Sequence, residues 1–485
     1  GTSSSTRSQI GGFYQNSAST SNNLTNGITK ISSINSHNWY GGVVNLNTKL
    51  SERFTLDFGV DARTYRGIHY QNIVDLLGSN NYADNTDVNN PNRVLTATYA
   101  ARPNLNPFFS LDYQTAKINY NNDGLVNWYG AFTQLEYSAD KLTAFFQGSV
   151  SNQGFRRDDF FLYLTPNPLS STDYKNLLGG NVKGGANYNI NDNHNVFVNA
   201  GYYSKQPFFN AVYPNNKSLV NENLTNEKVL GLEAGYGFRS AVFNANVNLY
   251  HTSWKDRYQR ANDAATDNPG GYYDFAGITQ VHSGIEVDMN AKVGDKLKLN
   301  GMFSLGKWVY EGNITGRRFD VNNNNISGGT TTTYFVDGTR VGDVAQMTAS
   351  LGAAYELAPR FNVDANYRLS DKLFTSLDTT KQTYETNKGT LELPSYGLVD
   401  AGISYRLLLG SDKSKSLNFR LNINNLFDEV YIAESRTNIF ASDFVSGTSG
   451  PTYASAGRTF NGVADNNQVF FGFGRTWNFT MRYNF

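Results

Sequence analysis

The stretch "FFGFGRTWNFTMRYNF", residues 470–485, decides the class of fold. From Phe471 to Phe485 every second residue is apolar, with Arg475 as the one exception. Alternation with period two predicts a β-strand that has one apolar and one polar face. The apolar face consists mainly of aromatic rings, and an exposed edge strand of that kind would aggregate in water. We therefore expect this face to lie against something other than water.

The same alternation recurs in pairs of segments joined by tight turns. Phe243 to Leu249, for example, follows a similar run that ends at Phe238, and only a few residues separate the two. Seven hairpins of this kind, the closing strand and a first strand near Ile10 to Phe13 predict about sixteen strands. Short turns alternate with long Asn-, Gly- and Thr-rich segments, which we place at residues 67–123, 154–179, 206–227, 260–276, 311–343, 376–395 and 428–468.

Composition narrows the class of protein. Hydrophobic residues make up only 39% and the mean hydropathy is -0.48, yet 31 Tyr and 32 Phe are present, so rings supply much of the apolar surface. The 41 basic and 41 acidic residues balance, which argues against a nucleic-acid partner. Cysteine is absent, which excludes disulfides, thiolate metal sites and cysteine nucleophiles.

The charged residues within the strands indicate which face contacts water, because most of them occupy the positions that alternate with the apolar residues. An Arg or Lys on a lipid-facing position near the membrane midplane would cost about 2–4 kcal/mol. The pattern therefore predicts an all-β fold, a transmembrane antiparallel β-barrel with short periplasmic turns and long extracellular loops. The alternative is a soluble propeller or tandem sandwich, but no blade repeat of ~40–50 residues is visible. The residues expected to face the lumen are Asp57, Asp61, Arg63, Glu136, Glu233, Glu286, Asp288, Asp364, Arg368 and Arg420.

Four segments resemble the C-terminal barrel of TonB-dependent outer-membrane receptors of the Bacteroidetes type, and residues 38–78 are similar to a hairpin in the middle of that barrel. "NENLTNEKVLGLEAGYGF" (221–238) is similar to a loop and strand of that family, and "INNLFDEVY" (423–431) is similar to the end of its penultimate strand. The aromatic closing strand resembles the signal that the barrel-assembly machinery reads, with Trp477, Phe479, Met481, Tyr483 and Phe485 as its residues.

The resemblance implies a barrel of 22 strands, an N-terminal plug domain and a TonB box. Because neither plug nor TonB box is found in residues 1–485, we expect this chain to be the C-terminal barrel portion, with a smaller barrel derived from such a receptor as the alternative. The implied function is active import of a scarce ligand (siderophore, vitamin, peptide or oligosaccharide) across the bacterial outer membrane. The implied partners are outer-membrane lipid, the TonB complex through the plug, and a surface lipoprotein. A passive porin and a structural or adhesive subunit are the alternatives.

Aromatic residues divide into two predicted groups. Those at strand ends are interpreted as girdles at the membrane interfaces: Trp39, Tyr40, Trp128, Tyr129, Trp308 and Tyr310. Those in the loops are predicted either to contact a ligand or to cover the mouth: Phe208, Phe209, Tyr272, Tyr273, Phe335 and Phe440.

Catalytic and metal motifs are weak. No two of the five histidines stand at HxxxH or HxH spacing. His282 and Ser283 are adjacent, and neighbouring strand residues point to opposite faces, so a hydrolase site there is not favoured. The oxygen-rich stretches 84–92 and 320–325 fit a polar loop better than a calcium loop. We expect no catalytic residue, no metal and no cofactor.

Overall fold

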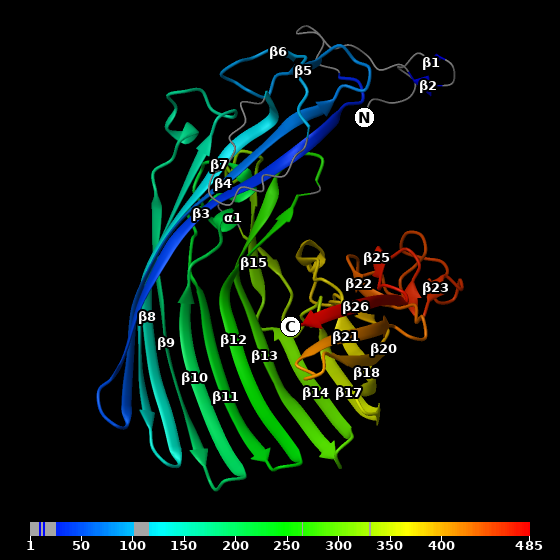
Figure 1. Cartoon of the computed structure of the whole chain (residues 1–485). Coiled ribbons are helices and arrows are strands. Elements are labelled where there is room, and N and C mark those ends of the chain that lie inside the picture. Colours follow the sequence, from blue (N-terminus) through cyan, green and yellow to red (C-terminus); the bar gives the residue numbers. More distant parts are fainter. Residues whose placement is uncertain (1–8, 11–12, 15–25, 101–115, 264, 329–330) are drawn as a thin grey trace.

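The computed structural model describes residues 9–10, 13–14, 26–100, 116–263, 265–328 and 331–485. Fifteen strands of nine or more residues dominate this part of the chain (Figure 1). They are β3 (Lys30–Lys49), β4 (Phe54–Asp75), β7 (Lys117–Ser138), β8 (Leu142–Asp159), β9 (Lys175–Asn189), β10 (His194–Lys205), β11 (Glu227–Arg239), β12 (Phe243–Asn262), β13 (Tyr272–Val293), β14 (Leu297–Tyr310), β17 (Ala345–Ala358), β18 (Phe361–Phe374), β20 (Tyr396–Leu409), β21 (Lys415–Asn424) and β26 (Thr476–Asn484).

The long strands form the seven predicted hairpins and the predicted closing strand. The prediction of a sixteenth wall strand near Ile10 to Phe13 is wrong. In its place are two strands of two residues each, β1 (Gln9–Ile10) and β2 (Phe13–Tyr14), which pair with each other. Ile10 and Phe13 are three positions apart, so they could not share one face of a strand. Within the described residues, no helix is long and apolar enough to span a membrane.

Several strands extend beyond the predicted limits. β4 ends at Asp75 and β7 begins at Lys117, so both edges of the long segment predicted at 67–123 belong to strands. A strand of 22 residues rises by roughly 70 Å, whereas ~9–11 residues cross a membrane. The upper part of such a hairpin therefore stands above the level that a membrane would occupy.

The long connections all lie at one end of the sheet and carry the remaining elements. These are β5 (Tyr82–Asp84), β6 (Arg93–Leu95), α1 (Phe209–Val212), β15 (Ile314–Phe319), β16 (Thr332–Tyr334), β19 (Glu392–Leu393), β22 (Ile432–Ser435), β23 (Thr459–Phe460), β24 (Val463–Ala464), β25 (Val469–Phe471) and the 3-10 turns Pro168–Ser170, Pro214–Asn216 and Thr379–Lys381. We call this end the loop end, and the other the turn end.

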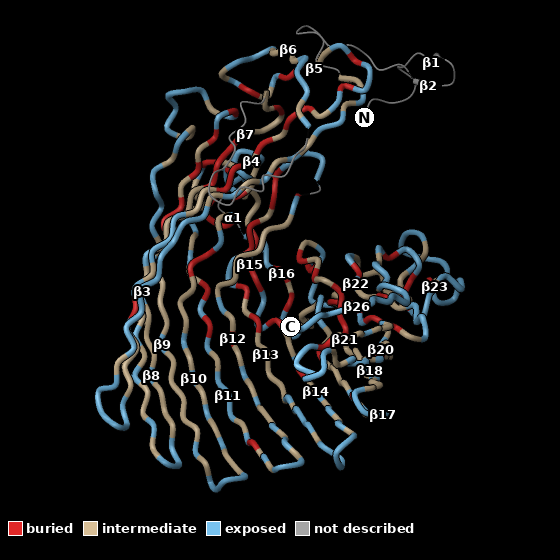
Figure 2. Tube along the Cα trace, in the orientation of Figure 1, coloured by how far each residue is buried: buried red, intermediate tan, exposed pale blue. Residues whose placement is uncertain are grey.

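Buried residues gather at the loop end (Figure 2). One cluster joins Phe275 and Ile278 of β13 to Tyr334 and Val336 of the 311–344 connection. Another joins Phe155 of β8 to Val212 and Tyr213 of the 206–226 connection. In the described residues, the four buried clusters do not include the turn-end halves of the strands, whose outer face stays exposed, as at Phe146 (59%) and Leu249 (54%). The apolar core thus fixes the loops, while the wall presents apolar side chains outward.

The sheet has the shape and strand order of a barrel, and each long strand pairs antiparallel with the next. β26 stands next to β3 in that order, yet no residue of β3 is registered against a residue of β26, although both strands are described in full. Since the number of strands is odd, β3 and β26 both run from the loop end to the turn end. Two strands of the same direction cannot form an antiparallel pair.

Candidate functional site: the lumen and the outer loops

The cross-strand register places the ten charged residues predicted to face the lumen on one face of the sheet. Successive strands align Asp57 with Gln134 and Gln134 with Gln147, and farther round Asn248 with Glu286. The same chain of pairs continues to Ser350 and Arg368, and to Ser404 and Arg420. Because directly paired residues point to the same side, the ten residues share one face of the sheet. The opposite face carries the exposed apolar side chains, and we propose that the charged face is the lumenal one.

Several charged groups on this face are paired with neighbours. Arg420 makes two parallel bonds to Asp364, from Nη1 to Oδ2 at 3.0 Å and from Nη2 to Oδ1 at 2.9 Å. Arg368 Nε donates to Asp400 Oδ2 at 2.8 Å, and Asn47 Nδ2 donates to Asp57 Oδ1 at 2.7 Å. These contacts make this face of the sheet polar.

The five residues of the predicted assembly signal share the opposite face of β26. Phe479 aligns with Leu421 and Met481 with Phe419, both on the outer face of β21. All nine residues of β26 are exposed, and the side chain of Phe485 beyond it is 96% exposed. Recognition by an assembly machinery stays a prediction.

The girdle interpretation is wrong for four of six aromatic residues. Tyr40 and Tyr129 lie on the outer face, but Trp39, Trp128, Trp308 and Tyr310 lie on the lumenal face. Trp128, for instance, pairs with Arg63, and Trp308 pairs with His282 and donates from Nε1 to Tyr250 Oη at 2.9 Å. Residues an even number of positions apart on one strand share a face, so counting from the charged residues would have placed these aromatic side chains on the charged face. Trp254 lies on the same face as these residues. Of the five tryptophans in the chain, Trp477 is therefore the one whose side chain lies on the outer face.

The loop aromatics predicted to contact a ligand have different environments. Phe208 is exposed (67%), with the Lys205 ammonium 4.4 Å from its ring centroid. Tyr272 is only 2% exposed and stacks on Phe319 at 5.2 Å between centroids. The covered ring agrees with the expectation that these aromatic residues cover the mouth, and ligand contact by Tyr272 stays an untested prediction. Packing among the loops, which sequence alternation does not encode, buries it.

The other loop aromatics are partly buried. Phe209 belongs to α1 and packs against the cluster of Phe155 and Tyr213. Tyr273 packs beside Phe275, and Phe440 packs against the cluster that contains Leu391 and Ile432. Phe335 lines a pocket in the outer loops.

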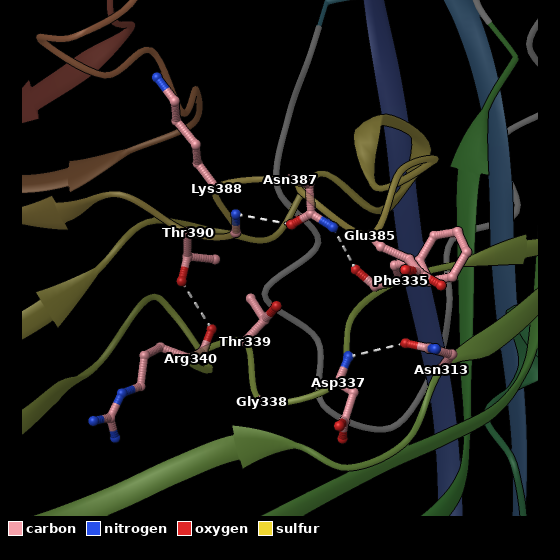
Figure 3. Close-up of a pocket in the computed structure, with 11 residues that line it drawn as sticks. Asn313, Phe335, Asp337, Gly338, Thr339, Arg340, Glu385, Asn387, Lys388 and Thr390 are labelled. Carbon is pink, nitrogen blue, oxygen red and sulfur yellow. Dashed lines mark hydrogen bonds between the residues drawn. The ribbon is translucent and has the colours of Figure 1, made fainter.

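That pocket has a volume of about 430 Å³ and lies between the 311–344 and 375–395 connections (Figure 3). Asn387 Nδ2 donates to the Phe335 carbonyl at 2.7 Å, and Thr390 Oγ1 donates to the Arg340 carbonyl at 3.0 Å. Gly389, whose φ is +67°, allows the tight turn between the two contacts. Side-chain bonds to backbone thus hold the two connections together.

Two of the charged residues around this pocket are used in other contacts. In Figure 3 the Lys388 side chain points away from the pocket, and its Nζ donates to Ser442 Oγ at 2.9 Å and to Asp443 Oδ1 at 2.5 Å. Asp337 Oδ1 accepts from the Gly312 amide at 2.7 Å. The lining also includes Glu385, together with amides, hydroxyls and backbone groups, which suit a small polar ligand.

Residues considered for catalysis or metal binding do not assemble into a site. His282 stacks on Trp308 in the lumen, whereas Ser283 lies on the outer face with its Oγ 2.8 Å from His251 Nδ1. Asp320 Oδ1 accepts from the amides of Asn322 and Asn324, so its loop is an ordinary polar turn. Among the described residues, no three His, Cys, Asp or Glu side chains could share a metal ion.

An apolar outer face, a polar lumen, short turns at one end and long loops at the other define an outer-membrane β-barrel protein. The sequence matches the family described as TonB dependent receptor-like, beta-barrel, over residues 2–426. The chain belongs to this family, and its localisation is the bacterial outer membrane.

Individual relatives agree with this assignment. The chain is 25% identical over 250 residues to a probable TonB-dependent siderophore receptor, PiuA, from Acinetobacter baumannii, covering 47% of this chain and 30% of that protein. Among solved structures, the copper transporter OprC superposes with a TM-score of 0.59 at 13% identity, over 93% of this chain and 57% of OprC.

The closed form of the ferric-catecholate import receptor Fiu from E. coli K12 has a TM-score of 0.54 at 14% identity, over 94% of this chain and 55% of Fiu. At these identities the structural likeness concerns the fold alone. The chain spans about a third to a little over half of the length of these proteins.

Proposed function

We propose that the protein to which this chain belongs imports a scarce ligand across the outer membrane with energy supplied through the TonB complex. The observation that carries the proposal is the family match over residues 2–426, which covers most of the wall and loops. PiuA is described as a siderophore receptor, and on that basis a metal–siderophore complex is the first ligand class to test. The chain itself would bind and guide, and would make no covalent bond.

We also propose that residues 1–485 are the C-terminal part of a larger barrel. β3 and β26 are neighbours in the strand order and run in the same direction, so only an odd number of further strands between them would make every pair antiparallel. Fifteen is seven short of the 22 strands that the sequence resemblance implies, and seven is odd. A plug domain with a TonB box is expected on the same polypeptide. A surface lipoprotein partner stays a prediction.

The test uses the full-length receptor in cells with and without a functional TonB complex. Uptake of a panel of radiolabelled ferric siderophores is expected only in cells with the complex. Equal uptake in both strains, together with steady ion conductance of the purified protein in planar bilayers, would favour the passive porin instead. No uptake in either strain, with altered surface assembly on deletion, would favour the structural subunit.

A further inference from the structure

Lysines mark the place on the outer face of β11 and β14 where the apolar part of the wall ends. On β11 the outward-facing residues are apolar throughout 230–238, and the next outward-facing residue is Lys228. On β14 they are apolar throughout 297–305, and the next is Lys307. Each run spans nine residues, and about 9–11 residues of a strand cross a membrane. Both exposed lysines therefore lie at the boundary between acyl chains and headgroups, on the side of the loops.

The cross-strand register brings further polar groups to the same place. Lys228 pairs directly with Lys255 of β12, so both side chains point outward. Lys307 pairs with Ser283 of β13, whose Oγ lies 2.8 Å from His251 Nδ1. Two strand spacings and four residues along a strand separate Lys255 from Lys307, which corresponds to roughly 16 Å between their Cα atoms. We call the following residues the cationic patch: Lys228, His251, Lys255, Asp256, Ser283 and Lys307.

The cationic patch carries an excess of positive charge. Asp256 Oδ2 accepts from Lys228 Nζ at 2.8 Å and so offsets one lysine. Within the described part of the chain, neither Lys255 nor Lys307 has an ion-pair partner. Three lysines and one aspartate thus leave two positive charges without a counter-charge on the protein. Like charges directly opposite each other destabilise a sheet, so an external anion at Lys228 and Lys255 would stabilise this part of the wall.

The same boundary has a different chemistry on β7, β8 and β9. The outward-facing residues that follow the apolar run there are Asn127, Asn152 and Asn176. Asn152 Nδ2 donates to Asn176 Oδ1 at 2.9 Å, so these amides bond to each other. Farther towards the loops on β8, Arg156 points outward but is paired with Asp158 at 2.9 Å. The uncompensated lysines therefore distinguish β11 to β14 from these strands.

We propose that the cationic patch binds the phosphate group of a lipid in the outer leaflet of the membrane. Lys255 and Lys307 pair with the phosphate oxygens, as lysine ammonium groups do with phosphates in other sites. The acyl chains of the same lipid lie against the apolar residues below the patch, such as Leu249 and Leu305. Basic residues beside a membrane recognise anionic headgroups in this way.

The position of the patch favours a lipid over a free anion. A lipid contacts the lysines with its headgroup and the adjoining apolar wall with its chains, whereas a free anion makes the first contact alone. The inference goes beyond ligand import, because it concerns the lipid that surrounds the barrel.

The test measures the lipid retained on the purified full-length receptor by native mass spectrometry in a non-ionic detergent. The probes are lipid A with its phosphate groups and the same lipid after enzymatic removal of the phosphates. The phosphorylated form is expected to be retained about tenfold more strongly, because the charge-assisted bonds form only with phosphate. Raising the salt concentration is expected to reduce this difference.

Double variants locate the site. Lys255→Gln/Lys307→Gln is expected to weaken retention of the phosphorylated lipid by about tenfold and to leave retention of the dephosphorylated lipid unchanged. Lys255→Arg/Lys307→Arg keeps both charges and is expected to retain the phosphorylated lipid. Lys292→Gln/Lys298→Gln is the matched control, because it removes two directly paired lysines from the opposite face of β13 and β14. This control should retain lipid as the unchanged protein does.

Equal retention of the two lipids, or unchanged retention in the Lys255→Gln/Lys307→Gln variant, would overturn the inference. Displacement of the lipid by inorganic phosphate at millimolar concentration would also overturn it, because the patch would then recognise a free anion and not a membrane lipid. The import proposal is decided separately, by uptake with and without the TonB complex, and neither lipid result changes that outcome.

Discussion

At the scale of single residues, the odd or even position of a residue along its strand predicted the face of its side chain better than the residue type did. That the ten charges share one face could be predicted, because each alternates with apolar residues along its strand. That this face is the lumenal one stays a prediction. Trp128 and Trp308 lie on the charged face too, but the preference of indoles for membrane interfaces suggested the wrong face. Tyr272 could not have been placed from the sequence, because the Phe319 ring that covers it belongs to another connection.

The positions of the indoles can be checked with lipids brominated on their acyl chains, which quench fluorescence at short range. In the full-length receptor, Trp477→Phe is expected to remove a quenchable component. Trp128→Phe and Trp308→Phe are expected to remove fluorescence that the lipids do not quench. Strong lipid quenching of Trp128 would mean that its side chain faces outward.

Asp274, at the loop end of β13 and outside any membrane-crossing segment, is a buried carboxyl among the outer loops. Burial raises its pKa to about 6, while Arg317, 3.6 Å away, and a hydrogen bond from Asn221 act in the opposite direction. A carboxyl whose pKa is raised on folding stabilises the fold at low pH, and this contribution is lost as pH rises through the folded value.

The loops around Asp274 are therefore expected to lose up to about 3 kcal/mol of local stability between pH 4 and pH 6, since each pKa unit corresponds to about 1.4 kcal/mol. Asp274→Asn should flatten that dependence. Amide hydrogen exchange of residues 265–276, compared between the two proteins across this pH range, measures it. Identical slopes in both proteins would show that another group titrates.

At the scale of elements, the hairpins could be predicted from the sequence, but the lengths of their strands could not. Strict alternation identified all seven hairpins, because each wall strand separates a lipid-facing from a lumen-facing side. Above the membrane, both sides of a strand can be covered, as at the adjacent buried residues Asn72 and Ile73 of β4. Alternation ends there although the strand continues, so the predicted loops were too long.

The two faces of one wall strand should differ sharply in tolerance of charge. Val247 pairs with Tyr236 and Val287 on the outer face of β12, while Asn248 pairs with Glu286 on the lumenal face. Val247→Arg is expected to destabilise the full-length receptor by about 2–4 kcal/mol in lipid. Asn248→Arg should have little effect, because Glu286 can pair with it. Urea unfolding in liposomes compares the two, and equal losses would contradict the assignment of faces.

At the scale of the whole molecule, the sequence predicted the class of barrel but not the relative direction of its first and last long strands, β3 and β26. The final strand was evident from its rings, and the family resemblance supplied the number 22. Only the strand registers reveal that β3 and β26 run in the same direction. Direction depends on counting every strand correctly, and the erroneous sixteenth strand would have reversed the conclusion.

The odd number of strands has a consequence for self-association. A bilayer inserts every copy the same way up, so any junction between two copies would place β26 of one beside β3 of the next. β26 and β3 run in the same direction in each copy. In a ring of two, three or more copies, every junction would therefore join two strands of the same direction. The odd number of long strands therefore excludes an antiparallel junction between copies of this chain.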